Sequence, residues 1–88
     1  SLSLIHTERA FLIRELKKRN MNVIPSKANY ILFYSPIPLE QKLKECNILI
    51  RNCENYRGLT KGYYRIAVRT HDENVMLLHA IDQILQEV

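Results

Sequence analysis

A four-residue signal, Thr70-His71-Asp72-Glu73, constrains the fold of this chain more than any other feature of its sequence. Threonine followed three residues later by glutamate is a capping box, in which the two side chains bind backbone N–H groups that the first helical turn leaves free. Apolar side chains then recur on one helical face, at Leu77, Ile81, Ile84 and Val88. The sequence therefore predicts a helix that begins at residue 71 and packs through this face.

The segments before this helix alternate between helical and strand patterns. In chain order they predict a helix over residues 3–19, strands over 23–25 and 29–34, a helix over 38–46, and strands over 48–53 and 63–68. The first two strands are expected to form a hairpin, with Ser26 and Lys27 in its turn. Asn20 and Asn22 are expected to end the first helix and Asn47 the second, and Pro38 is expected to be the first residue of the second helix. This order predicts an α+β fold, in which helices cover one face of a small, largely antiparallel sheet.

Composition narrows the class of protein further. With 88 residues, 47% of them hydrophobic, the chain is expected to fold as a single domain over residues 1–88. No run approaches the ~20 apolar residues of a membrane-spanning helix, so no membrane partner is expected.

Cys46 and Cys53 are expected to be buried, unreactive thiols, and no zinc-site spacing is present, so no metal is expected. The absence of a disulfide pattern or a signal peptide predicts a cytoplasmic location.

Strand alternation separates the residues of the last two strands into two faces. In the run 63–68, Tyr64, Ile66 and Val68 form an apolar face that is expected to meet the helices. Arg65 lies on the other face and is therefore expected on the side without helices. The same alternation in the run 48–53 places Arg51 on that face as well. Two guanidinium groups on one surface can each donate paired hydrogen bonds to a carboxylate or a phosphate. From the residues alone, the competing interpretation is two solvated arginines without a binding role.

The run Lys61-Gly62-Tyr63-Tyr64-Arg65-Ile66-Ala67-Val68 allows a different function. It partly matches the RNP1 signature of RNA-recognition sheets, in which exposed aromatic rings stack on bases. The match is imperfect, because Tyr64 stands where a small residue is expected and Arg65 where a stacking aromatic is expected. An RNA- or anion-binding module that uses the open sheet face is therefore the alternative hypothesis, and exposed, paired aromatic residues on the central strands would favour it.

Two longer segments resemble a known enzyme family. Residues 48–74 contain an arginine at a strand end, an N-Y-x-G-L turn at 55–59, and R-I-A-V-R-T at 65–70 before the acidic start of the last helix. Residues 8–33 contain an S-x-A-N-Y pattern at 26–30. Together these segments resemble the C-terminal small domain of fold-type I pyridoxal-phosphate enzymes, in the branch of the histidinol-phosphate aminotransferases and threonine-phosphate decarboxylases.

This resemblance implies a domain that orients the substrate of a pyridoxal-phosphate-dependent biosynthetic enzyme. By position, Arg65 matches the family's arginine that holds the substrate α-carboxylate, and Arg51 matches the arginine that contacts the phosphate end of the substrate. Asn29 matches the asparagine of the S-x-A-N-F/Y pattern, with no chemical role assigned to it. The N-Y-x-G-L turn is closer to the threonine-phosphate decarboxylases, but Arg57 stands where proline is expected there, so transamination and decarboxylation both stay open.

The resemblance also implies what this chain does not supply. The family's catalytic lysine and its cofactor-binding groups lie in the large domain, so no catalytic or cofactor-binding residue is expected among residues 1–88, and the chain alone is expected to be inactive. The expected partners are a small amino-acid substrate, with or without a phosphate group, the enzyme's own large domain and the second subunit of a homodimer. Nucleic acid is not expected to bind.

Overall fold

The computed structural model describes residues 2–26 and 29–88, and it contains the helices and strands in the predicted order. They are α1 Leu2–Lys18, β1 Asn22–Ile24, β2 Tyr30–Tyr34, α2 Glu40–Glu45, β3 Arg51–Asn52, β4 Tyr63–Ala67 and α3 His71–Gln86. Lys27, a residue of the predicted turn, and Ala28, the alanine of the S-x-A-N-Y pattern, lie outside the described residues. Among the described residues, no helix combines the length and the apolar character needed to cross a membrane.

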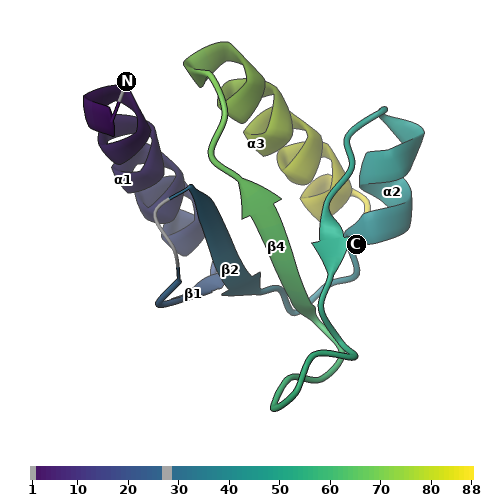
Figure 1. The fold of residues 1–88 in the computed structure, drawn as a ribbon. Coiled ribbons are helices and arrows are strands. Elements are labelled where there is room, and N and C mark those ends of the chain that lie inside the picture. Colours follow the sequence, from purple (N-terminus) through teal and green to yellow (C-terminus); the bar gives the residue numbers. More distant parts are fainter. Residues whose placement is uncertain (1, 27–28) are drawn as a thin grey trace.

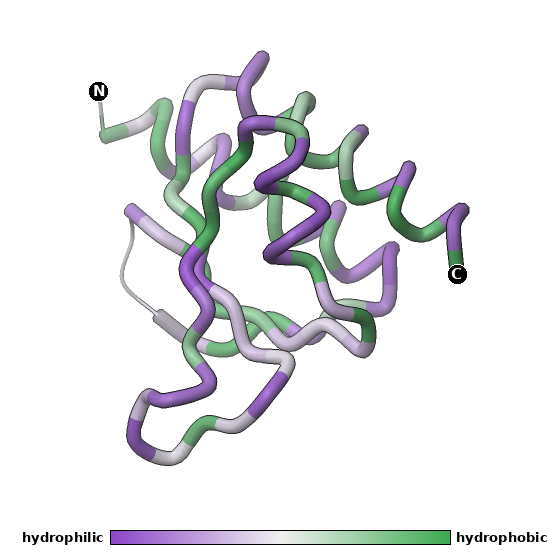
Figure 2. Tube along the Cα trace, turned by 90° about the vertical axis from the view of Figure 1, so that its right-hand side faces the viewer, coloured by the Kyte–Doolittle hydropathy of each residue, from purple (hydrophilic) through white to green (hydrophobic). Residues whose placement is uncertain are grey.

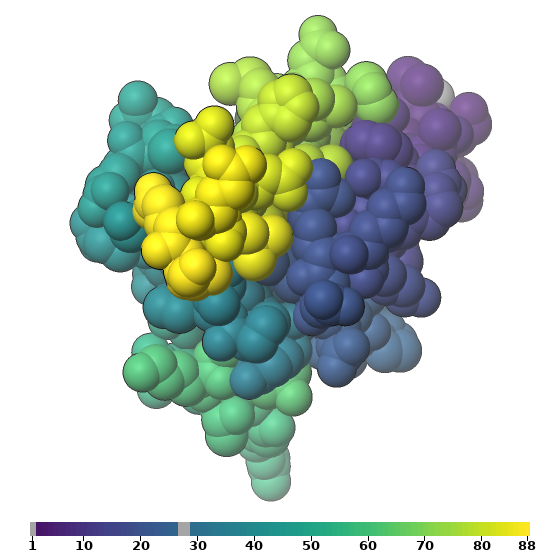
Figure 3. All heavy atoms as spheres, turned by 180° about the vertical axis from the view of Figure 1, so that it is seen from behind, coloured from purple at the N-terminus to yellow at the C-terminus, as the bar shows by residue number. Residues whose placement is uncertain are grey.

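The strands form one antiparallel sheet in the order β1-β2-β4-β3 (Figure 1). The predicted hairpin of β1 and β2 is present, and β2 and β4 form the centre of the sheet, with Leu32 opposite Arg65 and Tyr34 opposite Tyr63. Seen from behind, helices α1 and α3 lie over the sheet (Figure 3). The predicted α+β fold, with helices on one face of an antiparallel sheet, is confirmed.

The core fills the space between the sheet and the helices. Apolar side chains from all three helices, from β2 and from the N-cap of α2 are completely inaccessible to solvent: Leu12, Leu16, Ile31, Phe33, Leu39, Leu43 and Ile81. Helix α3, which ends near the C label in Figure 2, alternates between hydrophobic and hydrophilic segments along its coil, as a helix with one buried face does. Its predicted face is buried at Leu77, Ile81 and Ile84, whereas Val88 follows the helix end and is exposed.

Three local predictions are wrong. Helix α2 begins at Glu40 with Leu39 as its N-cap, so Pro38 precedes the helix and is not its first residue. Strand β3 spans two residues and not the predicted run 48–53, partly because the Ile48 N–H donates to the Leu43 carbonyl at the end of α2 and cannot join a ladder. Cys46, at the C-cap of this short helix, is exposed, whereas Cys53 is buried as predicted.

Left-handed backbone marks the predicted helix ends and one tight turn. Asn20 and Asn47 both have a φ of +62°, the conformation that ends a helix after its last turn. Gly62 has a φ of +102° directly before β4, and a Cβ built there would lie 2.5 Å from the Tyr34 ring. Only glycine fits this position, so the turn that leads into β4 depends on it.

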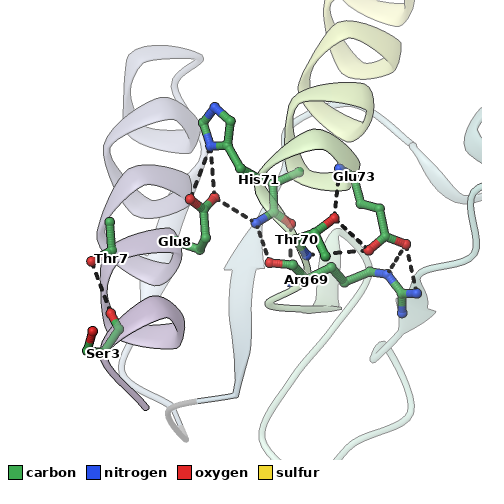
Figure 4. Close-up of polar contacts among 8 residues, drawn as sticks. Ser3, Thr7, Glu8, Arg69, Thr70, His71 and Glu73 are labelled. Carbon is green, nitrogen blue, oxygen red and sulfur yellow. Dashed lines mark hydrogen bonds and ion pairs between the residues drawn. The ribbon is translucent and has the colours of Figure 1, made fainter. Parts of the chain in front are cut away.

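A buried polar cluster joins the start of α3 to α1 (Figure 4). The Asn74 side chain is 1% exposed; its amide nitrogen donates to the Glu8 carboxylate at 3.1 Å and to the Arg69 carbonyl at 3.0 Å. Its oxygen accepts from the Arg69 N–H at 3.2 Å, and His71 Nδ1 lies 3.1 Å from the Glu8 carboxylate. The cluster therefore fixes the connection between β4 and α3 against the first helix.

This cluster makes the stability of the fold dependent on pH. The hydrogen bond from Asn74 lowers the pKa of Glu8, and the contact with His71 lowers it further, although burial opposes both. Because the pKa is depressed in the folded state, this stabilisation is present above the ordinary glutamate pKa of about 4.3 and is lost as the pH falls through the folded value. The free energy of unfolding, measured in urea from pH 3 to pH 7, is expected to depend less steeply on pH in Glu8→Gln than in wild type. An equal dependence would contradict this role, and Glu45→Gln, at an exposed carboxylate, is the control.

The capping box has the predicted geometry. Thr70 Oγ1 accepts from the Glu73 N–H at 3.3 Å, and the Glu73 carboxylate accepts from the Thr70 N–H at 3.4 Å. Thr70→Ala removes one partner of the helix start and is expected to lower the free energy of unfolding by about 1 kcal/mol in urea denaturation. Thr60→Ala, at an exposed loop threonine, controls for the loss of the methyl and hydroxyl groups. A loss of the same size in both variants would contradict the capping role.

Candidate functional site

The two arginines predicted to share a face lie directly opposite each other in the sheet. Arg51 of β3 pairs with Arg65 of β4 in the antiparallel ladder, so both side chains leave the same face. The core residues Tyr64 and Ile66 occupy the alternate positions of β4 and are 4% and 5% exposed. Alternation, which buries one face of β4, thus presents Arg65 on the face without helices.

A hollow of about 590 Å³ on this face brings together the three residues singled out from the sequence. Arg51 and Arg65 come from adjacent strands, and Asn29 comes from the residue before β2. The remaining lining residues are Tyr30, Glu40, Leu49, Ile50, Asn52 and Ala67. The hollow therefore has the size of a small-molecule site, with two guanidinium groups and an amide among its walls.

The charge of the hollow favours an anion. Within residues 2–26 and 29–88, neither Arg51 nor Arg65 forms an ion pair with a carboxylate. Glu40 is the acidic residue of the lining, and its carboxylate accepts a hydrogen bond from the Asn52 amide at 3.2 Å. Both guanidinium groups thus keep their donors available for a carboxylate or phosphate oxygen.

A second hollow, of about 530 Å³, lies beside the first on the same face. Tyr30 and Arg65 line both hollows, and the Arg65 Cζ atom lies 4.6 Å from the centroid of the Tyr30 ring. The other residues of the second hollow are Pro25, Ser26, Leu32 and Tyr56. The Tyr30–Arg65 pair is therefore the shared wall between a polar hollow and a more apolar one.

Cys53 is buried next to this face without forming a reactive site. Burial is the largest influence on its thiol and raises the pKa, although the positive charges of Arg65 and Arg51 act in the opposite direction. A thiol with a raised pKa carries little thiolate at neutral pH and is a poor nucleophile. In the part of the chain that the structure describes, no three His, Cys, Asp or Glu side chains converge on a possible metal site.

The aromatic residues of the RNP1-like run divide between the two faces. Tyr64 is buried, and its hydroxyl accepts a hydrogen bond from the Leu39 N–H at 3.2 Å. Tyr63 lies on the helix-free face and contacts the ring of Tyr34 at a centroid distance of 5.2 Å. One pair of partly exposed aromatic rings is therefore present, at the end of the sheet away from Asn29.

Several residues of the first hollow were not predicted from the sequence. Tyr30 lies diagonally beside Arg65 because of the register of β2 against β4, which the sequence does not indicate. Glu40 and Asn52 meet through the packing of α2 on the edge of the sheet, and no spacing along the chain indicates this. Leu49 and Ile50 line the hollow because the chain before β3 is not part of the ladder.

Comparison with known proteins relates this chain to a group of enzymes. The chain is 41% identical over 68 residues to a threonine-phosphate decarboxylase of Salmonella typhimurium, an alignment that covers 74% of this chain and 19% of that protein. It is 40% identical over 84 residues to a histidinol-phosphate aminotransferase of Caldanaerobacter subterraneus, which covers 92% of this chain and 24% of that enzyme. The chain is homologous to one segment of these enzymes. The resemblance predicted from the sequence, to this branch of the fold-type I pyridoxal-phosphate enzymes, is confirmed.

Solved structures agree with this relationship. The histidinol-phosphate aminotransferase of Clostridium acetobutylicum superposes with a TM-score of 0.88 and 28% identity, over 97% of this chain and 27% of that one. The L-threonine-O-3-phosphate decarboxylase of Porphyromonas gingivalis superposes with a TM-score of 0.77 and 26% identity, over 90% of this chain and 26% of that one. No protein-family model matches the chain. The chain thus spans about a fifth to a quarter of the length of the curated aminotransferase and decarboxylase relatives that it matches.

Proposed function

We propose that residues 1–88 are the C-terminal small domain of a pyridoxal-phosphate-dependent aminotransferase or decarboxylase, and that this domain orients the substrate. The observation that carries the proposal is the cross-strand pair of Arg51 and Arg65, which lines one hollow with Asn29 and has no carboxylate partner among the described residues. Homology to enzymes of both reaction types supports it.

The proposed roles follow from the geometry of the guanidinium group. A planar fork donates two parallel hydrogen bonds to one carboxylate or phosphate, which fixes the orientation of the anion as well as its position. Arg65, on a central strand, holds the α-carboxylate of an amino acid, and Arg51, on the edge strand, contacts a phosphate at the far end of the substrate. Asn29, the residue before β2, forms part of the wall of the same hollow.

The residues of this chain do not form a complete site for the cofactor. Neither hollow is lined by a lysine among the described residues, so the amine that holds pyridoxal phosphate is assigned to the large domain of the enzyme. Pyridoxal phosphate acts as an electron sink when bound, and the protein decides which bond breaks by orienting the substrate. We place this domain in a cytoplasmic homodimer, as the resemblance implies, and expect the isolated chain to be inactive.

The isolated chain is expected to have no specific site for pyridoxal phosphate. Its described lysines lie outside both hollows, so added cofactor should react only weakly and without saturation, as it does with solvated amines. Equilibrium dialysis with pyridoxal phosphate, compared with an unrelated basic protein of similar size, measures this directly. Saturable binding of one cofactor per chain would contradict the proposed division between the two domains.

A chimeric enzyme tests the proposed function. The matching segment of the Clostridium acetobutylicum histidinol-phosphate aminotransferase, which superposes with a TM-score of 0.88, is replaced by this chain. The purified chimera is expected to retain its cofactor and to act on histidinol phosphate or on threonine phosphate, and the product identifies transamination or decarboxylation. The same chimera with Arg51→Ala and Arg65→Ala together is the control. A folded, cofactor-loaded chimera that is inactive on both substrates would contradict the proposal.

The Tyr34–Tyr63 pair favours an RNA-binding module as the second candidate. Stacking on such rings contributes about 1–3 kcal/mol per base and makes binding strongly dependent on salt. Titration of the chain with a fluorescent single-stranded RNA at two salt concentrations separates the candidates. Micromolar, salt-dependent binding that is lost in Tyr63→Ala would favour RNA, and no binding is expected from the substrate-orienting domain.

A further inference from the structure

The direction of the Arg65 guanidinium decides which hollow receives its charge. Arg65 lines both hollows, with Asn29 and Arg51 on one side and Leu32 and Tyr56 on the other. A side chain at this shared wall that moved freely would divide its time between the two. Recognition of an anion by Arg51 and Arg65 together therefore requires a contact that limits the movement of Arg65.

No acidic residue among those described provides that contact. None of their carboxylates lies within 4.0 Å of the Arg65 guanidinium. Arg51 lies directly opposite in the ladder and carries the same charge, and like charges at such positions destabilise each other. The Tyr30 ring faces the guanidinium at 4.6 Å, and a cation over an aromatic face is attracted by the negative charge density of the ring.

Tyr30 is itself held in place from helix α1. Arg9 donates from Nη1 to the Tyr30 carbonyl at 2.7 Å and from Nη2 to the Ser26 carbonyl at 3.4 Å. The Ser26 hydroxyl donates to the same Tyr30 carbonyl at 3.1 Å and accepts from the Leu32 N–H at 3.3 Å. The backbone that carries the Tyr30 ring is therefore held at the start of β2 by hydrogen bonds from Arg9 and from Ser26.

We propose that Tyr30 is a positioning residue that restricts the Arg65 guanidinium to the wall shared by the two hollows, within reach of an anion beside Arg51, and that Arg9 acts through Tyr30 from helix α1. The identity of the anion rests on the proposed function, but the orientation of Arg65 does not. If the ring were lost, the apparent affinity for an anion would fall in proportion to the time that Arg65 spends elsewhere.

Nuclear magnetic resonance of the arginine Nε–Hε groups in the 88-residue chain tests the orientation directly. Tyr30→Phe keeps the ring and is expected to leave the ring-current shift and the order parameter of Arg65 close to wild type. Tyr30→Leu is expected to move the Arg65 resonance to the position of a solvated arginine and to lower its order parameter. Tyr34→Leu is the matched control, since this half-buried tyrosine lies on the same strand and face but contacts Tyr63.

Titration with inorganic phosphate adds a second measurement on the same samples. Phosphate binding, followed by shifts of the Arg51 and Arg65 resonances, is expected to weaken about threefold to tenfold in Tyr30→Leu and less than twofold in Tyr30→Phe. Arg9→Gln keeps the ring but releases its backbone, and an intermediate loss of Arg65 order is expected. If the Tyr30→Leu chain does not fold, Arg9→Gln provides the test in its place.

The outcomes separate this inference from the proposed function. A folded Tyr30→Leu or Arg9→Gln chain whose Arg65 shift and order parameter equal those of wild type would overturn the positioning role. If no variant, including wild type, binds phosphate while Tyr30→Leu still mobilises Arg65, the positioning role is supported and the proposed anion site is wrong.

Discussion

In the enzyme that we propose contains this chain, an Arg65→Ala variant is expected to lose roughly two to four orders of magnitude in kcat/KM. A hydrogen bond to a charged group contributes about 1.5–3 kcal/mol, and a guanidinium fork makes two of them to one carboxylate. Each factor of ten in rate corresponds to about 1.4 kcal/mol. Arg65→Lys is expected to recover little of this loss, because an ammonium group cannot reproduce the planar fork.

The effect of Arg51→Ala should depend on the substrate. Because Arg51 is assigned to the distal phosphate, its loss should reduce kcat/KM more for a phosphorylated substrate than for the dephosphorylated analogue, whereas Arg65→Ala should penalise both. Arg57→Ala, at an exposed arginine of the loop before β4, is the control for a change of net charge. A kcat/KM of Arg65→Ala within about threefold of the wild-type value would contradict the proposed contact with the carboxylate. Equal losses on both substrates in Arg51→Ala would remove the phosphate role.

Ile81→Ala is expected to lower the free energy of unfolding of the chain by roughly 2–5 kcal/mol. Ile81 is completely buried on the inner face of α3, so the substitution removes apolar contact and leaves a cavity among fixed neighbours. A domain of this size has a free energy of unfolding of only about 5–15 kcal/mol, so this one change removes a large part of it. Urea denaturation measures the difference.

Met76→Ala on the same helix is the matched control for Ile81→Ala. Met76 is 62% exposed, so its truncation is expected to change the free energy of unfolding by about 0.5 kcal/mol or less. Similar losses in the two variants would show that the register of α3 differs from the one described. A loss above 2 kcal/mol in Ile81→Ala alone agrees with it.

The sequence was most informative where a local interaction sets the structure. The capping box at Thr70 and Glu73 requires only residues three apart, and it defined the start of α3 correctly. Strand alternation needs no knowledge of distant partners, and it placed Arg65 and Arg51 on one face before the strand order was known. The match of Asn29 to a family pattern then identified a third residue that lines the first hollow with Arg51 and Arg65.

Features that depend on contacts between distant segments were not predicted. The short length of β3 depends on how α2 ends, because the Ile48 N–H is used there. Cys46 is exposed at the C-cap of α2, although the buried Leu43 lies three residues before it. The contact between Tyr30 and Arg65 depends on the register of β2 against β4, and the hydrogen bond from Arg9 spans 21 residues of chain.

The shortness of the two outer strands affects how copies of this chain meet in concentrated solution. Strands β1 and β3 form the edges of the sheet and span only three and two residues, so each offers few free backbone groups to a strand from a neighbouring molecule. Long, flat edges are the usual template for fibril growth and domain exchange, and short ones suppress both. Backbone pairing between copies of this chain through the edges of its sheet should therefore be weak.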